Sequence, residues 1–169
     1  AAIVTAREAL MRAALFALAL VAAPGHAQTA IGFEGLRQDP SAPVEVASDA
    51  LTVEQAQGRA VFTGNVVVAQ GALRLAAGTV TVEYAADGAG IRRIAAAGGV
   101  TFATATDAAE AREATYELAT GALTMTGDVV LTQGPATITG DRLVADLRAG
   151  TGRIEGRVRT VFRPAAATD

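Results

Sequence analysis

From residue 44 onward, apolar and polar side chains alternate along the chain with a period of two. Gly, Asn or Asp interrupts the alternation at intervals of about 8 to 12 residues, a spacing typical of all-β sandwiches, barrels and rolls. The pattern therefore predicts an all-β, antiparallel fold of about 16 short strands. The expected strands cover residues 43–47, 50–55, 59–63, 66–70, 72–76, 79–85, 91–96, 100–105, 108–111, 113–118, 122–126, 129–133, 136–139, 142–147, 152–156 and 158–163.

The same pattern occurs twice, 63 residues apart. Gly64-Asn65-Val66-Val67-Val68-Ala69-Gln70-Gly71 returns as Gly127-Asp128-Val129-Val130-Leu131-Thr132-Gln133-Gly134, and apolar residues match on both sides of these segments. The repeat therefore predicts a tandem of β units. A fold built by repetition favours an extended surface over a catalytic pocket. The matching apolar pairs are Leu51/Ala114, Val53/Tyr116, Ala60/Leu123, Phe62/Met125, Val66/Val129, Val68/Leu131, Leu73/Ala136, Leu75/Ile138, Val80/Leu143, Val82/Ala145, Tyr84/Leu147 and Ile91/Ile154.

Two dipeptides, Gly64-Asn65 and Gly127-Asp128, occupy equivalent places between β runs. A two-residue hairpin of type II′ favours Gly at its first position and accepts a small polar residue at its second. Both dipeptides are therefore predicted to be hairpin turns without a chemical role.

One face of the alternation is a continuous row of aliphatic residues, expected to point inward. Two interiors are open at this point, a closed dry core and an interior accessible to an apolar ligand. The expected inward residues are Leu51, Val53, Phe62, Val66, Val68, Leu75, Val80, Val82, Tyr116, Leu123, Met125, Val129, Leu131, Ile138 and Leu143. The opposite face carries Thr52, Glu54, Thr63, Arg74, Thr79, Thr81 and Glu83.

Residues 11–27 have the pattern of a secretory signal peptide. Met11-Arg12 supplies a positive start, an apolar run covers residues 13–23, and small residues stand at Gly25 and Ala27. The run is much shorter than the roughly 20 residues that span a bilayer. We expect cleavage before Gln28 and a secreted mature chain; an uncleaved anchor and an apolar core helix are the alternatives.

The chain is predicted to contain four parts. Upstream residues and the signal peptide occupy residues 1–27, a flexible lead-in occupies 28–42, the β domain occupies 43–163, and a C-terminal tail occupies 164–169.

Composition excludes several kinds of chemistry. The absence of Cys removes disulfides, thiolate metal sites and thiol catalysis, and the single His, His26, falls in the segment expected to be cleaved. No catalytic residue, metal site or cofactor is therefore predicted. The net charge of −3 and the 4% aromatic content also argue against nucleic-acid binding.

Charged residues leave two alternatives open. Glu113 and Glu117 would share one face of a strand, so a glycosidase-like carboxylate pair is an alternative to solvated surface charge. An arginine cluster near the end of the chain either protects an exposed strand edge or contacts the phosphates or acidic sugars of a lipid headgroup. The cluster consists of Arg142, Arg148, Arg153, Arg157, Arg159 and Arg163.

Residues 43–162 resemble the OstA-like domain of the LptA lipopolysaccharide transport family. A D-x-L-x-V segment at 49–53 leads to G-x-A-x-F-x-G-N-V-x-V-x-Q-G at 58–71, and then to L-x-A-x-x-V-x-V at 75–82. The family usually has Asp where this chain has Gly78, and Asp141 restores that residue in the second copy.

The resemblance implies an antiparallel β-jellyroll, an open V-like roll that carries lipopolysaccharide across the periplasm to the outer membrane without a cofactor. Implied partners are LptC-like inner-membrane and LptD-like outer-membrane proteins, together with an end-to-end homo-oligomer. The alternatives are an LptC-like anchored homologue and a structural cell-surface β-repeat protein without a lipid ligand.

The resemblance also gives roles to residues. Acyl chains are expected on Phe62, Val66, Val68, Leu75, Val80, Val82, Leu123, Met125, Val129, Leu131, Ile138 and Leu143. Protomer edges are expected at Val44, Val46, Val158 and Phe162.

Overall fold

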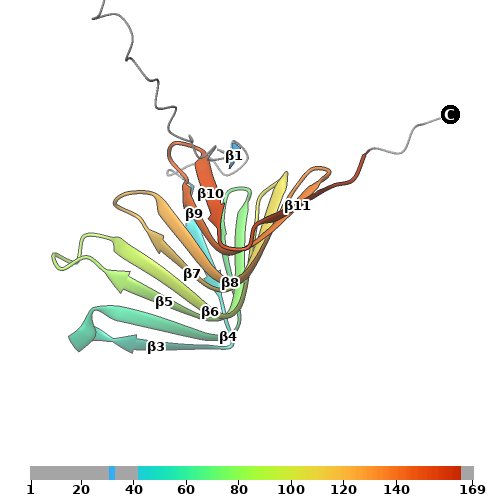
Figure 1. Ribbon diagram of the computed structural model, residues 1–169. Helices are drawn as coiled ribbons and strands as arrows, with labels where there is room; N and C mark the ends of the chain where they lie inside the picture. The colour runs from blue at the N-terminus through green and yellow to red at the C-terminus, as the bar shows by residue number, and fades with distance from the viewer. Residues whose placement is uncertain (1–30, 33–41, 165–169) are drawn as a thin grey trace, which may run out of the picture.

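The computed structural model of the chain describes residues 31–32 and 42–164. In these residues, antiparallel pairing joins eleven β-strands into one sheet (Figure 1), which confirms the all-β antiparallel prediction. None of the helices in the described residues is long and apolar enough to span a membrane. The elements are β1 (Ile31–Gly32), β2 (Val44–Ala47), β3 (Ala50–Glu54), η2 (Gln55–Gln57), β4 (Arg59–Gln70), β5 (Leu73–Tyr84), β6 (Ile91–Ala103), β7 (Asp107–Glu117), β8 (Ala122–Gln133), β9 (Ala136–Asp146), β10 (Thr151–Glu155) and β11 (Arg159–Phe162).

Each long strand from β4 to β9 bends near its middle, so that one sheet forms two layers. The register of every neighbouring pair among these strands shifts at the bend, for example between Thr63 and Val66 of β4. We call the line of bends the corner. The first layer ends in β3 and β10 and the second layer ends in β2 and β11, because these short strands pair with opposite halves of β4 and β9. The fold is therefore an open V-like roll.

The prediction of hairpin turns at Gly64-Asn65 and Gly127-Asp128 was wrong. Both dipeptides lie inside continuous strands, β4 and β8, where φ is 79° and 46° in the first and 86° and 49° in the second. Two successive residues with positive φ bend a strand sharply, and here the chain continues into the other layer. Each strand from β4 to β9 joins two predicted strands, so the 16 expected strands become ten, and β1 is an eleventh that was not predicted. The hairpins lie instead at residues 71–72 and 134–135, between β4 and β5 and between β8 and β9.

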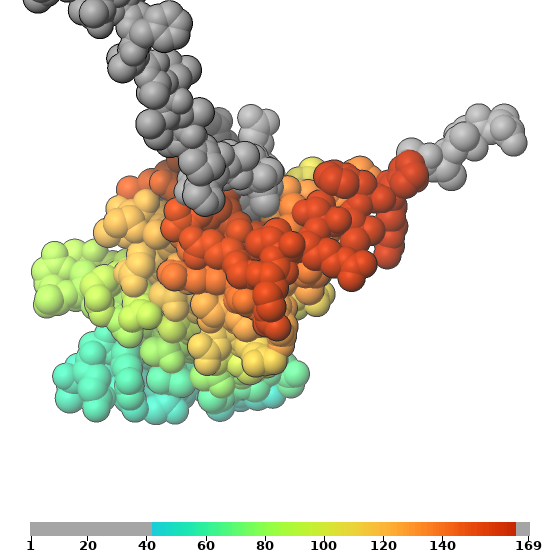
Figure 2. Space-filling model, viewed as in Figure 1, coloured from blue at the N-terminus to red at the C-terminus, as the bar shows by residue number. Residues whose placement is uncertain are grey.

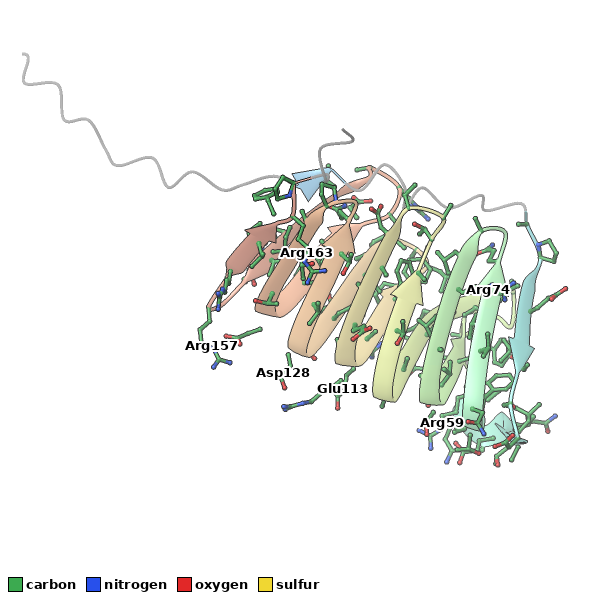
Figure 3. The ribbon with its side chains drawn as sticks, turned by 90° about the vertical axis from the view of Figure 1, so that its right-hand side faces the viewer. Arg59, Arg74, Glu113, Asp128, Arg157 and Arg163 are labelled. Carbon is green, nitrogen blue, oxygen red and sulfur yellow. The ribbon has the colours of Figure 1, made fainter. Side chains whose placement is uncertain are left out.

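Along the corner, polar side chains of successive segments pair with each other. Arg157 donates to the Asp141 carboxylate at 2.5 Å from Nη2, and these hydrogen bonds lower the pKa of Asp141. Figure 3 shows Asp128, at the bend of β8, and Arg157, between β10 and β11, along the same edge of the roll. Such pairs hold successive strands together where the ladder of backbone hydrogen bonds is interrupted. The pairs are Asp49 with Asn65, Arg112 with Asp128, and Asp141 with Arg157.

Gly78 departs from the family pattern for a reason that the packing of the corner explains. A Cβ on Gly78 would lie 3.2 Å from the carbonyl oxygen of Gly98 and 3.4 Å from its Cα. At this bend two glycine backbones are in contact, whereas at the other bends described above side chains pair with each other. An Asp at residue 78 would require the backbone at Gly98 to move.

Strand pairing repeats with the offset seen in the sequence. Val68 pairs with Leu75 between β4 and β5, and Leu131 pairs with Ile138 between β8 and β9. The predicted tandem is therefore confirmed, because equivalent residues of the two copies occupy equivalent places in the strand pairing.

The apolar core lies in the corner, where the two layers are closest. Leu143 and Met125 are 0% exposed, and half-buried side chains such as Phe62 pack against the buried cluster. Leu51 and Val53 lie on the predicted inward face, opposite Phe62 and Ala60, but they are 53% and 60% exposed and do not belong to the buried core. Both belong to β3, which pairs only with β4 and has no further strand beside it to cover them.

Candidate functional site

An apolar cavity of about 440 Å³ lies between the two layers at the mouth of the V, opposite the corner. Its lining residues stand at strand ends far from the bends, such as Leu73 at the start of β5 and Ile91 at the start of β6. The volume falls in the usual range for sites that bind small molecules. The lining residues are Val44, Val68, Gln70, Leu73, Leu75, Ile91, Ile94, Phe102, Tyr116, Leu118, Leu123, Leu147 and Arg148.

The two walls of the cavity come from different parts of the roll. The wall in the second layer uses β2, β4, β5 and the end of β6, where Phe102 lies. The wall in the first layer uses the start of β6, then β7, β8 and the residues after β9, including Leu147. The cavity therefore runs diagonally across the roll and reaches the edge strand β2 through Val44.

The divergence of the layers explains why the cavity forms at the mouth. Near the corner, side chains such as Met125 and Val129 fill the whole space and are 0% exposed. Farther from the bends the layers separate, so side chains of similar size no longer meet. The same alternation of aliphatic residues therefore produces a closed core at the corner and an open apolar surface at the mouth.

The structure places the predicted inward face correctly but divides it. Eleven of the twelve residues expected to bind lipid are buried, and Phe62 is half-buried. Only Val68, Leu75 and Leu123 among them line the cavity. The other predicted residues pack in the core, so their contact with lipid stays a prediction. Sequence reasoning did not assign Gln70, Leu73, Ile91, Ile94, Phe102, Leu118 and Leu147 to a binding surface, although several of them have apolar character beside a turn. Arg148 belongs to the arginine cluster, for which a headgroup contact was one of two alternatives.

Two polar side chains at the mouth have defined electrostatic surroundings. Burial raises the pKa of Tyr116, while the positive charge of Arg148 acts in the opposite direction. The Tyr116 phenol is therefore neutral at pH 7, which suits an apolar wall. Arg148 donates from Nη2 to the carbonyl oxygen of Leu118 at 2.7 Å.

The carboxylates that suggested an enzyme lie away from the cavity. Glu117 forms an ion pair with Arg93 at 3.2 Å, and Glu113 is exposed beside the bend of β7 (Figure 3). Within residues 31–32 and 42–164, no group of three or more His, Cys, Asp or Glu side chains could hold a metal ion.

The predicted edge residues lie at both ends of the roll. Val44, Val158 and Phe162 are 42%, 51% and 71% exposed, whereas Val46 is half-buried. Figure 2 shows the last strands, coloured red, spread over the face of the molecule that is turned to the viewer. β1 pairs with part of β10, whereas the outer edge of β11 pairs with none of the described strands.

Comparisons with known proteins agree with this architecture. The family model of the LptA/(LptD N-terminal domain) LPS transport protein matches residues 45–151. An uncharacterized protein of Rhizobium meliloti (strain 1021) is 30% identical over 157 residues, which cover 86% of this chain and 84% of that protein.

A solved structure has a similar fold. It is the crystal structure of LptH, the LptA homologous periplasmic component of the conserved lipopolysaccharide transport device from Pseudomonas aeruginosa. The match has a TM-score of 0.66 at 20% identity and covers 77% of this chain and 99% of LptH. At this identity the similarity establishes the fold alone.

Proposed function

Because this chain belongs to the LptA/LptD N-terminal domain family of lipopolysaccharide transport proteins, we propose that it binds lipopolysaccharide and carries it across the periplasm toward the outer membrane. Members of this family transport lipid and are not enzymes. The proposed role is that of one segment in a protein bridge between the two membranes.

The apolar cavity at the mouth of the V is the observation that supports lipid binding best. Each methylene that moves from water into such a site gains about 0.8 kcal/mol, so ten methylenes would contribute about 8 kcal/mol before the costs of association. Because the mouth is open, a bulky headgroup can stay outside while acyl chains lie against the walls. This arrangement suits a lipid with several chains.

Location and partners are further parts of the proposal. We place the mature chain, beginning near Gln28, in the periplasm, which is also the compartment of LptH. Residues 11–27, which carry the expected signal peptide, lie outside the described residues. LptC-like and LptD-like proteins would contact the free strand edges at the two ends of the roll.

Lipid analysis of the purified protein tests the proposed function. We expect the full chain, secreted by a Gram-negative host and purified in mild detergent, to release a multi-acyl lipid on solvent extraction and mass spectrometry. A structural β-repeat protein would release none. N-terminal sequencing of the same material separates a cleaved chain from an LptC-like anchored homologue, which would remain in membranes and begin before Ala13.

The free edges at opposite ends have the geometry for end-to-end association. In the second layer, β2 runs toward the corner and β11 runs away from it, as the pairing of Val44 with Gln70 and of Phe162 with Ala136 requires. β11 of one protomer can therefore add antiparallel to β2 of the next, with both layers in line. Val44 and Phe162 would then lie on the same side, so the apolar cavity would continue toward the next protomer.

Proline at residues 160 and 162 should abolish end-to-end association and leave the fold intact. The N–H of Arg163 donates to Pro135 of the neighbouring loop, so the alternate residues Thr160 and Phe162 direct their N–H groups away from β9. Removing both donors leaves the next strand without its ladder. We expect Thr160→Pro/Phe162→Pro to be monomeric by light scattering at concentrations where the parent chain associates.

The matched control is Thr160→Ala/Phe162→Ala, which removes the same side chains and keeps both donors. It should associate more weakly than the parent but more strongly than the proline variant. If the folded proline variant kept the oligomer size of the parent across a concentration series, the contact would lie elsewhere.

A further inference from the structure

Arg148 is the cationic side chain among the residues that line the cavity. It follows the end of β9 and stands at the mouth, where the apolar walls meet water. A lipid whose acyl chains lie against those walls would place its headgroup near this side chain.

Contacts from the turn between β7 and β8 hold Arg148 in place. A Cβ built on Gly121 would lie 2.7 Å from the Cγ of Arg148 and 3.1 Å from its Cδ, so the stem lies directly on the glycine backbone. The guanidinium donates to the carbonyl oxygen of Leu118 at 2.7 Å. One exposed side chain of the arginine cluster is thus fixed beside the cavity.

The charge of Arg148 is not neutralised by a carboxylate of the described residues. Its neighbours in the cluster, Arg153 and Arg157, form ion pairs with Glu155 and Asp141, whereas Arg148 takes part in none of the ion pairs. The nearby Asp146 accepts hydrogen bonds through Oδ1 from the backbone N–H groups of Arg148 and Ala149, each at 2.9 Å. This carboxylate therefore caps the turn.

We propose that Arg148 binds the anionic group of the lipid headgroup, a phosphate or a carboxylate, while the acyl chains lie in the cavity. The proposal rests on the proposed function. A guanidinium has five N–H donors, and the bond to Leu118 uses one, so a bidentate contact with two anionic oxygens remains available. The cavity would then select acidic over neutral lipids with the same acyl chains.

Binding of lipid A, and of the same lipid A after enzymatic removal of its phosphates, tests this assignment. We expect the parent protein to bind the phosphorylated form about 10- to 100-fold more tightly, the range for a hydrogen bond to a charged group. Arg148→Gln should bind the two forms with about equal affinity. Arg153→Gln, in the same cluster but away from the cavity, should bind both forms like the parent.

Several results would overturn the assignment. Equal affinity of the parent for the two forms of lipid A, or an equal loss of affinity in the two Gln variants, would do so. Competition by inorganic phosphate at concentrations similar to those of lipid would indicate a site for the free anion. Failure of the parent to bind either lipid would reject the proposed function itself. If Arg148→Gln does not fold, Arg148→Lys decides, since it keeps the charge, loses the fork and should show a reduced preference.

Discussion

Replacing Ile94 by glutamate should weaken lipid binding at neutral pH by at least about 100-fold, because a carboxylate that loses water on an apolar contact costs several kcal/mol. Ile94 is half-buried on the wall of the cavity, so its replacement can reach water while the cavity is empty. Acyl chains in the cavity would remove that water. The binding of fluorescent lipopolysaccharide to the variant measures the loss.

Ala95→Glu is the matched control. Ala95 is the next residue of the same strand, is also half-buried, and faces the opposite side, where it pairs with Thr81 and Thr115. The same charge at this position should change lipid affinity by less than about threefold, as expected for a surface substitution. Equal losses in both variants would mean that general charge, and not the cavity, controls binding.

Leu143→Ala should lower the free energy of unfolding by about 2 to 5 kcal/mol, because it removes a fully buried side chain from a tightly packed corner. Leu143 is 0% exposed, and none of its surface lines the cavity. Urea unfolding without lipid measures the loss of stability. Lipid affinity of the folded variant should stay close to that of the parent.

Leu73→Ala makes the same chemical change in the cavity wall and should have the opposite profile. Leu73 is half-buried, so its truncation should cost less than about half as much stability as Leu143→Ala. It should weaken lipid binding, because the contact with the acyl chains is lost. If the two variants showed the same stability loss, the distinction between corner core and cavity wall would be wrong.

The repeat and the period of two were enough to predict the fold class and the inward face. Val68 and Leu131 point inward at equivalent places because a register of two residues fixes the side of a strand. The sequence could not distinguish a turn from a bend at Gly64-Asn65, since both need positive φ. The pairing of both halves of β4 with β5, on either side of a register shift, shows that the chain passes through a corner there.

The sequence could not show whether an inward residue lies in the corner core or on the cavity wall. Periodicity gives Met125 and Leu73 the same apolar, inward character, yet one fills the corner and the other lines the cavity. The distance of each residue from the bend determines which of the two places it occupies, and this distance depends on how the strands pair. For the same reason, periodicity could not show that the inward-facing Leu51 and Val53 stay exposed on the edge strand β3.

The arginine cluster could be recognised from the sequence but not divided into roles. Arg157 forms an ion pair with Asp141 at the corner, and Arg153 forms an ion pair with Glu155 on its own strand. Arg148 stands at the cavity because the turn between β7 and β8 comes close to the end of β9. Such long-range proximity leaves no mark on the local sequence.

Site-specific photo-crosslinking in cells that make lipopolysaccharide decides whether the cavity carries lipid. A photo-reactive amino acid at Leu73, on the cavity wall, should capture lipopolysaccharide. The same amino acid at Thr81, on the outer face of the same strand, should capture none. Equal labelling at the two positions, or no labelling at Leu73 in a protein confirmed to be folded and exported, would contradict lipid transport through the cavity.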